Sequence, residues 1–183
     1  MKELFLSSER KITILESDNN KAALISRMYD IEQESFFATV VYGTGGVVID
    51  NWVRLLASGE RDIATWNDTL QIDNYFVVAD DILGGLFAMN KQSSVIEYFA
   101  PDTLEWESLE LYYPHFVKWL LEGDIDLFYS DLRWDNWQSD VEMLSFNDGI
   151  AFFPFLWTKS EEERCKRVIS INEIVLLSFD MRE

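Results

Sequence analysis

The sequence predicts a single α+β domain, residues 1–183, with one central, mainly antiparallel sheet covered by helices from both ends of the chain. Three observations predict this class. The β-rich segments in the middle of the chain are joined by connections too short for a parallel crossover. Apolar residues recur at helical spacing before and after them. The chain has 183 residues, 48% of them hydrophobic, which suits one domain with one core.

The first part of the chain is expected to hold a strand and two helices. Residues 11–16 alternate Ile12 and Ile14 with polar residues, which indicates a strand. Ser17-Asp18 and Ser35 then provide side chains that suit helix N-caps. Two helical faces follow these caps: Leu24, Ile25, Met28 and Tyr29 after the first, and Phe36, Phe37, Val40 and Val41 after the second.

The middle of the chain predicts an antiparallel meander. Turn residues at 80–85, 90–93 and 101–102 separate its last four strands. A short helix is expected around 64–67. The strands are expected at 47–49, 52–57, 75–79, 86–89, 95–99 and 104–109.

The last third is predicted to be helical. Pro114 suits the first position of a helix, and Asp124 suits the N-cap of the next one, whose apolar spacing continues from Ile125 to Leu144. Ser170 and Glu173 match a capping box that opens a final helix. The charged segment 161–167 is interpreted as an exposed helical face.

Charge excludes two classes of partner. The chain carries 15 basic and 33 acidic residues, a net charge of −18, so it should repel nucleic-acid phosphates and anionic membrane surfaces. A basic protein is the partner that electrostatics favours. Cys165 is the single cysteine and no segment resembles a signal peptide, so a cytoplasmic location is expected. The oligomeric state stays open.

The usual catalytic and cofactor motifs are not recognisable. The glycines at 43–46 follow a predicted helix and precede a predicted strand, the reverse of a phosphate-binding loop, so they are interpreted as a turn. His115 is the single histidine, which disfavours zinc sites and serine or cysteine triads. We therefore expect no metal, no cofactor and no catalytic residue.

Paired carboxylates leave one enzymatic alternative. Glu105 and Glu107 flank Trp106 on a predicted strand, so their side chains should project about 6.5–7 Å apart from one face. That spacing suits a carboxylate-dependent hydrolase acting on glycans or another small substrate. Asp80 and Asp81 form a second candidate pair. Alternation on a half-solvated strand gives the same pattern without any function.

Acidic and aromatic residues concentrate between residues 97 and 148. This stretch has 13 acidic residues against Lys118 and Arg133, a local net charge of −11, and four tryptophans. Large aromatics supply interface hot spots and carboxylates supply steering, so a protein-binding face is the favoured interpretation. Its expected partner-binding residues are Asp80, Asp81, Glu105, Trp106, Glu107, Asp131, Trp134, Asp135 and Trp137.

Several segments resemble a bacterial family of unknown function, number 2625. The resemblance rests on residues 42–50 (YGTGGVVID), 78–81 (VADD), 84–90 (GGLFAMN), 98–107 (YFAPDTLEWE) and 128–134 (FYSDLRW), and it extends from about residue 11 to residue 160. More loosely, a glycine-led aromatic strand, a second strand and then an aromatic helix like residues 116–121 resemble, in their order, the SUKH superfamily of toxin-immunity and cell-wall-regulator proteins. That resemblance implies an antiparallel α+β fold and a non-enzymatic binding role, with a toxin as one kind of basic partner.

Overall fold

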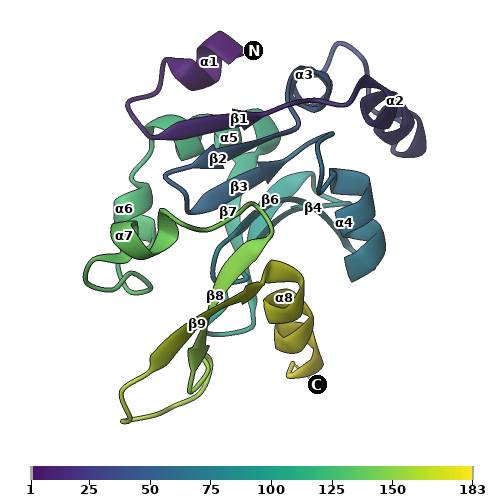
Figure 1. Ribbon diagram of the computed structural model, residues 1–183. Coiled ribbons are helices and arrows are strands. Elements are labelled where there is room, and N and C mark those ends of the chain that lie inside the picture. Colours follow the sequence, from purple (N-terminus) through teal and green to yellow (C-terminus); the bar gives the residue numbers. More distant parts are fainter. Residues whose placement is uncertain (1, 183) are drawn as a thin grey trace.

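A seven-stranded antiparallel sheet forms the centre of the protein, as predicted. The computed structural model describes residues 2–182, and its sheet follows chain order from one edge to the other (Figure 1). Each strand pairs with the next along the chain, which confirms the meander. The strands are β1 (Ile12–Leu15), β2 (Gly46–Ile49), β3 (Val53–Leu56), β4 (Tyr75–Asp81), β5 (Leu86–Asn90), β6 (Val95–Phe99) and β7 (Trp106–Tyr112).

Helices cover both faces of this sheet because its central strands carry apolar side chains on both sides. The Phe87 ring lies 5.0 Å from that of Phe116 on one face. On the other face, the Phe99 ring stacks on that of Phe179 at 4.8 Å. The helices are α1 (Lys2–Leu6), α2 (Asn19–Met28), α3 (Phe36–Gly43), α4 (Ile63–Leu70), α5 (Tyr113–Glu122), α6 (Ile125–Phe128), α7 (Trp137–Val141) and α8 (Ile171–Asp180).

The predicted N-caps lie where the sequence placed them. Asp18 accepts hydrogen bonds from the first turn of α2, and Ser35 accepts one from Ala38 in α3. Asp124 caps α6, and Ser170 caps α8 by accepting from the Asn172 amide. Each of these bonds joins residues only two or three positions apart, so it does not depend on tertiary contacts.

The predicted turn at residues 43–46 brings two chain segments into close contact. A Cβ atom on Gly45 would lie 1.9 Å from the Glu16 carbonyl oxygen, and one on Gly59 would lie 2.2 Å from the Gly45 carbonyl oxygen. Hydrogen bonds from Gly45 to Leu15 and from Gly59 to Gly45 fix this junction. The glycines therefore serve close backbone packing at the start of β2.

The last third differs from the predicted helical region in two places. Residues 161–167 do not form a helix: they lead into β9 (Cys165–Ser170), which pairs with β8 (Asp148–Phe153) in a separate hairpin. Most of β9 is exposed, so it lacks the apolar alternation that identifies a strand. Between Ile125 and Leu144 there are two short helices instead of a continuous one, and Leu132 and Trp134 lie between them.

The edge strand β7 also begins later than predicted and extends to Tyr112. Its register with β6 shifts between Ile96 and Glu97, which inserts extra residues into the edge. Glu107 and Glu110 are exposed on this strand. A bulge and charged side chains are common protection for an edge strand against pairing with another chain.

Candidate binding cleft

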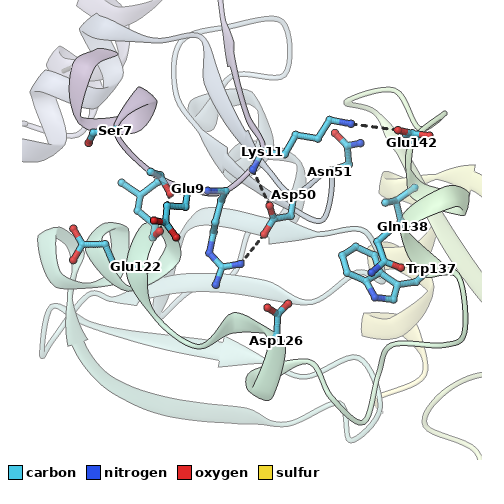
Figure 2. A pocket seen from close by; sticks show the side chains of 14 residues that line it. Ser7, Glu9, Lys11, Asp50, Asn51, Glu122, Asp126, Trp137, Gln138 and Glu142 are labelled. Atoms are coloured by element: carbon cyan, nitrogen blue, oxygen red, sulfur yellow. Dashed lines mark hydrogen bonds and ion pairs between the residues drawn. The ribbon is translucent and has the colours of Figure 1, made fainter.

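A surface cleft of about 830 Å³ is the first candidate site. It lies where the segment after α1 meets the β2–β3 turn, the end of α5, and helices α6 and α7 (Figures 1 and 2). Figure 2 shows Trp137 and Gln138 on one side, Glu9 and Glu122 on the other, and Asp126 across from Asp50. The lining residues are Ser7, Ser8, Glu9, Arg10, Lys11, Asp50, Asn51, Leu121, Glu122, Asp126, Trp137, Gln138, Val141 and Glu142.

An ion pair joins the N-terminal segment to the β2–β3 turn inside this cleft. Arg10 Nη1 donates to Asp50 Oδ2 at 2.7 Å, and Arg10 Nη2 donates to the Gly123 carbonyl at 2.6 Å. The Lys11 amide donates to Asp50 Oδ1 at 3.0 Å. The Arg10 and Asp50 side chains are 15% and 19% exposed, so water only partly screens the pair.

Turn chemistry places Asp50. Asp50 and Asn51 have φ angles of +52° and +53°, and the Trp52 amide donates to the Ile49 carbonyl at 2.9 Å. Two left-handed residues at the centre of a four-residue turn are typical of a type I′ turn, which favours Asp and Asn. The sequence Asp50-Asn51 therefore fixes the turn that holds a carboxylate at the cleft.

Negative charge predominates in the lining of the cleft. Five carboxylates and two cations line it, and Arg10 already pairs with Asp50. From outside the lining, Arg133 pairs with Asp126, and Lys118 lies 3.8 Å from Glu122 with both side chains mostly exposed. Lys11 Nζ lies 3.8 Å from Glu142 with both side chains mostly exposed, a contact of little energetic weight. The carboxylates of the lining are Glu9, Asp50, Glu122, Asp126 and Glu142.

An aromatic cluster supports the wall formed by Trp137. The buried Trp52 ring lies 5.0 Å from that of Trp137 and 5.7 Å from that of Trp134. The Arg133 guanidinium carbon lies 4.0 Å from the Trp137 ring centroid, a cation–π contact, and its Nη1 pairs with Asp126. Trp137 is thus held between a buried tryptophan and a buried cation.

The structure brings only part of the predicted partner-binding set to this cleft. Trp137 lines it, and Trp134 packs behind it, with its Nε1 donating to Asp140 at 2.6 Å. Asp131 and Asp135 are exposed in the connection between α6 and α7 but do not line the cleft. Sequence reasoning did not select Arg10, Asp50 or Arg133, although the Asp50-Asn51 pair was a readable turn signal.

Glu105, Trp106 and Glu107 lie in a different place. Glu105 and Trp106 line a second hollow of about 840 Å³, which shares no lining residue with the first cleft among residues 2–182. Trp106 stacks on Tyr75 with ring centroids 4.0 Å apart. Glu105 and Glu107 are both exposed, and only Glu105 contacts the hollow. This arrangement does not enclose a catalytic carboxylate pair.

Asp80 and Asp81 require a correction, because neither is on a surface. Both are fully buried at the end of β4, so they cannot contact a partner in this structure. Asp80 accepts from Arg54 Nε at 2.7 Å and pairs with Arg61 Nη1. The pattern of two adjacent acids suggested exposure, whereas here both faces of the strand are covered.

Asp81 accepts four hydrogen bonds. Its Oδ1 accepts from the amides of Leu83 at 2.8 Å and Gly85 at 2.9 Å. Its Oδ2 accepts from the hydroxyls of Tyr98 at 2.7 Å and Tyr129 at 3.1 Å. Burial raises the pKa of Asp81 above the usual value, and the hydrogen bonds offset only part of that effect.

The raised pKa of Asp81 predicts a pH dependence of stability. Because the native state holds this proton more tightly than the unfolded state, Asp81 stabilises the fold below about pH 3.9, the unfolded value. Its contribution is lost as the pH rises from there through the folded pKa. Asp81→Asn removes the titration and keeps one of the two acceptor oxygens. The free energy of unfolding of the natural protein should therefore fall relative to this variant as pH rises.

Urea unfolding of both proteins at steps between pH 3.5 and pH 7 measures this difference. Asp131→Asn, which changes an exposed carboxyl, is the matched control and should show no such trend. A difference that stays constant, or grows in favour of the natural protein as pH rises, contradicts a raised pKa for Asp81.

Two further features of the described chain bear on the kind of site. No helix within residues 2–182 is both long and apolar enough to cross a membrane. In the same residues, no three His, Cys, Asp or Glu side chains are grouped as metal ligands.

Comparisons with known proteins give a family and uncharacterised relatives. The family described as "Protein of unknown function DUF2625" matches residues 1–174. The Escherichia coli K12 protein YbfG, described as uncharacterised, is 38% identical over 178 residues, covering 90% of this chain and 82% of its own. An uncharacterised Haemophilus influenzae Rd protein is 32% identical over 177 residues, covering 86% and 78%. No solved structure matches the chain.

Proposed function

The chain belongs to the DUF2625 family of proteins of unknown function, and from this premise we propose that it is a non-enzymatic module that binds a basic protein surface. The observation that carries the proposal is the cleft of about 830 Å³ with five carboxylates and two cations in its lining. The net charge of −18 favours a cationic partner over the whole surface. The acidic lining of the cleft supports binding of such a partner there.

The aromatic cluster supports the same role. Trp137 is a large side chain on the wall of the cleft, and Trp52 and Arg133 hold it in position. A rigid aromatic anchor beside charged residues is the usual composition of an interface hot spot with a polar rim. Asp131 and Asp135, exposed nearby in the chain, would add to steering from the rim.

A finer proposal concerns the type of partner. We propose a distant relation to the SUKH superfamily, with an immunity-type role in which the basic partner is a toxin. The order of the sequence motifs supports this relation, as does the central seven-stranded antiparallel sheet with helices on both faces. A chain with one cysteine also suits a reducing compartment, so we propose the cytoplasm as its location.

Capture of partners from the native cell at low and high salt tests the binding proposal. The variant Glu9→Gln/Glu122→Gln/Glu142→Gln removes three exposed carboxylates from the cleft. We expect a basic protein to be captured at low salt, its association rate to fall about 10-fold with this variant, and capture to weaken as salt rises.

The matched control removes the same number of charges elsewhere. Glu161, Glu162 and Glu163 are exposed in the connection between β8 and β9, so changing all three to Gln gives the same net charge without altering the cleft. If both triple variants slow association equally, the attraction is a property of the whole protein and the cleft is not the site. Capture of no basic protein by the natural chain contradicts the proposal altogether.

A further inference from the structure

We propose that the occupant of the cleft is a short linear segment of the partner that combines Lys or Arg with large apolar side chains, as a basic amphipathic helix does. This inference rests on the proposed function and names the chemistry of the segment. It comes from a second property of the cleft, the apolar side chains around it.

Three strongly exposed apolar residues are sequence neighbours of residues in the lining. Met143 is 89% exposed, Leu127 is 71% exposed and Leu6 is 66% exposed. Each is next in sequence to a lining residue: Glu142, Asp126 and Ser7, respectively. Single exposed apolar residues are normal on a protein surface, but several beside one concave site are typical of an interaction surface.

The size of the cleft is compatible with insertion of a segment of the partner. A volume of about 830 Å³ lies within the range of about 300–1,000 Å³ for sites that enclose small ligands. Such a volume accommodates a few side chains of a partner. A linear element placed along the cleft can insert those side chains while its neighbours contact the rim.

The carboxylates and the exposed apolar residues together indicate which side chains the bound segment carries. Carboxylates in the lining attract Lys and Arg, and the acidic chain as a whole disfavours an acidic segment. Leu6, Leu127 and Met143 offer apolar contacts to Leu, Met or Phe on the same segment, and methionine adapts readily to different partners. A helix with basic and apolar faces presents both at once, a known mode of recognition in grooves.

Three labelled synthetic peptides of equal length and net charge test the inference by fluorescence anisotropy. The first is a 14-residue helix of Leu and Lys with the leucines on one face. The second contains the same residues in a scrambled order, and the third replaces every Leu by Ser. We expect the amphipathic peptide to bind at least 10-fold more tightly than the Lys/Ser peptide, with the scrambled peptide clearly weaker than the amphipathic one.

A pair of matched double variants locates the binding. Leu127→Ser/Met143→Ser removes two exposed apolar side chains that are next in sequence to the lining residues Asp126 and Glu142. Leu24→Ser/Met28→Ser removes the same two types from α2, where they are 53% and 57% exposed. Helix α2 lies far from α6 and α7 (Figure 1). We expect the first variant to weaken binding of the amphipathic peptide at least 10-fold, and the second to change it less than 2-fold.

The possible failures are distinguishable. If all three peptides bind equally and Leu127→Ser/Met143→Ser has no effect, the segment chemistry is wrong while the proposed attraction of a basic surface stands. If no peptide binds, both the inference and the proposed cleft are overturned. Sedimentation of the same variants tests whether the protein forms a dimer through this surface. If the natural protein is a dimer and Leu127→Ser/Met143→Ser dissociates it, a second copy of the chain occupies the cleft and the inference is overturned.

Discussion

Replacing Asp80 by alanine should destabilise the protein by about 3–5 kcal/mol, the usual cost of leaving a buried charge without its partner. Asp80 is fully buried, and the side chains of its two partners, Arg54 and Arg61, are 1% and 8% exposed. Removal of the carboxylate leaves two guanidinium groups in the interior without a counter-charge. Because the free energy of unfolding of a typical domain is only about 5–15 kcal/mol, this single change removes a large part of the stability of the fold.

The effect should extend beyond β3 and β4. Arg54 also donates to the carbonyl of Phe146 at 3.2 Å and to that of Asp81 at 2.9 Å. The Asp80–Arg54 pair therefore ties the sheet to the segment that enters β8. We expect local opening of residues 146–148 to accompany the loss of global stability, measurable by amide hydrogen exchange.

Urea unfolding measures the main effect, and Asp131→Ala provides the control. Asp131 is exposed, and such surface changes usually alter stability by no more than about 0.5 kcal/mol. Asp80→Asn, which keeps an oxygen acceptor but not the charge, should fall between the two. A loss below about 1 kcal/mol for Asp80→Ala would mean that both arginines regain water without cost, contrary to their burial.

Replacing Trp52 by alanine should cost about 3–5 kcal/mol, as is usual for a buried aromatic residue. The Trp52 side chain is completely buried, and its ring lies 5.3 Å from that of Tyr129 and 5.0 Å from that of Trp137. Its removal leaves a cavity between the β2–β3 turn and the α6–α7 region. Equilibrium unfolding in urea measures the loss.

The same substitution also tests the link between the core and the cleft. The buried Trp52 ring packs against Trp137 and lies under the Arg133 guanidinium. Its loss should therefore weaken peptide binding even under conditions where the variant remains folded. Phe153→Ala is the control, because Phe153 is 64% exposed on the β8–β9 hairpin. If Trp52→Ala lowers stability but leaves binding unchanged, the position of Trp137 does not depend on this packing.

Local patterns were sufficient for much of the fold. The N-caps at Asp18, Ser35 and Ser170 were predictable because the side-chain oxygen bonds to amides only a few residues away. The order of the central strands was predictable because their short connections permit only antiparallel neighbours. Both signals act over short stretches of chain.

Patterns failed where the burial of a segment depended on distant residues. β9 was missed because its exposed side chains give no alternation, and its identity as a strand comes from pairing with β8. The helical spacing from Ile125 to Leu144 was misread because aromatic residues pack on Trp52 from a loop as well as from a helix.

The sequence by itself determined the class of fold, the strand order, most helix starts and the acidic character of the surface. Only the tertiary structure decided that Asp80 and Asp81 are in the core, whereas Asp50 and Trp137 meet at a cleft. The physical reason is the distance along the chain over which each interaction acts. Capping and turn formation depend on neighbours in sequence, but burial depends on which remote elements cover a residue, and the segments 7–11, 50–51, 121–126 and 137–142 meet only once the chain has folded.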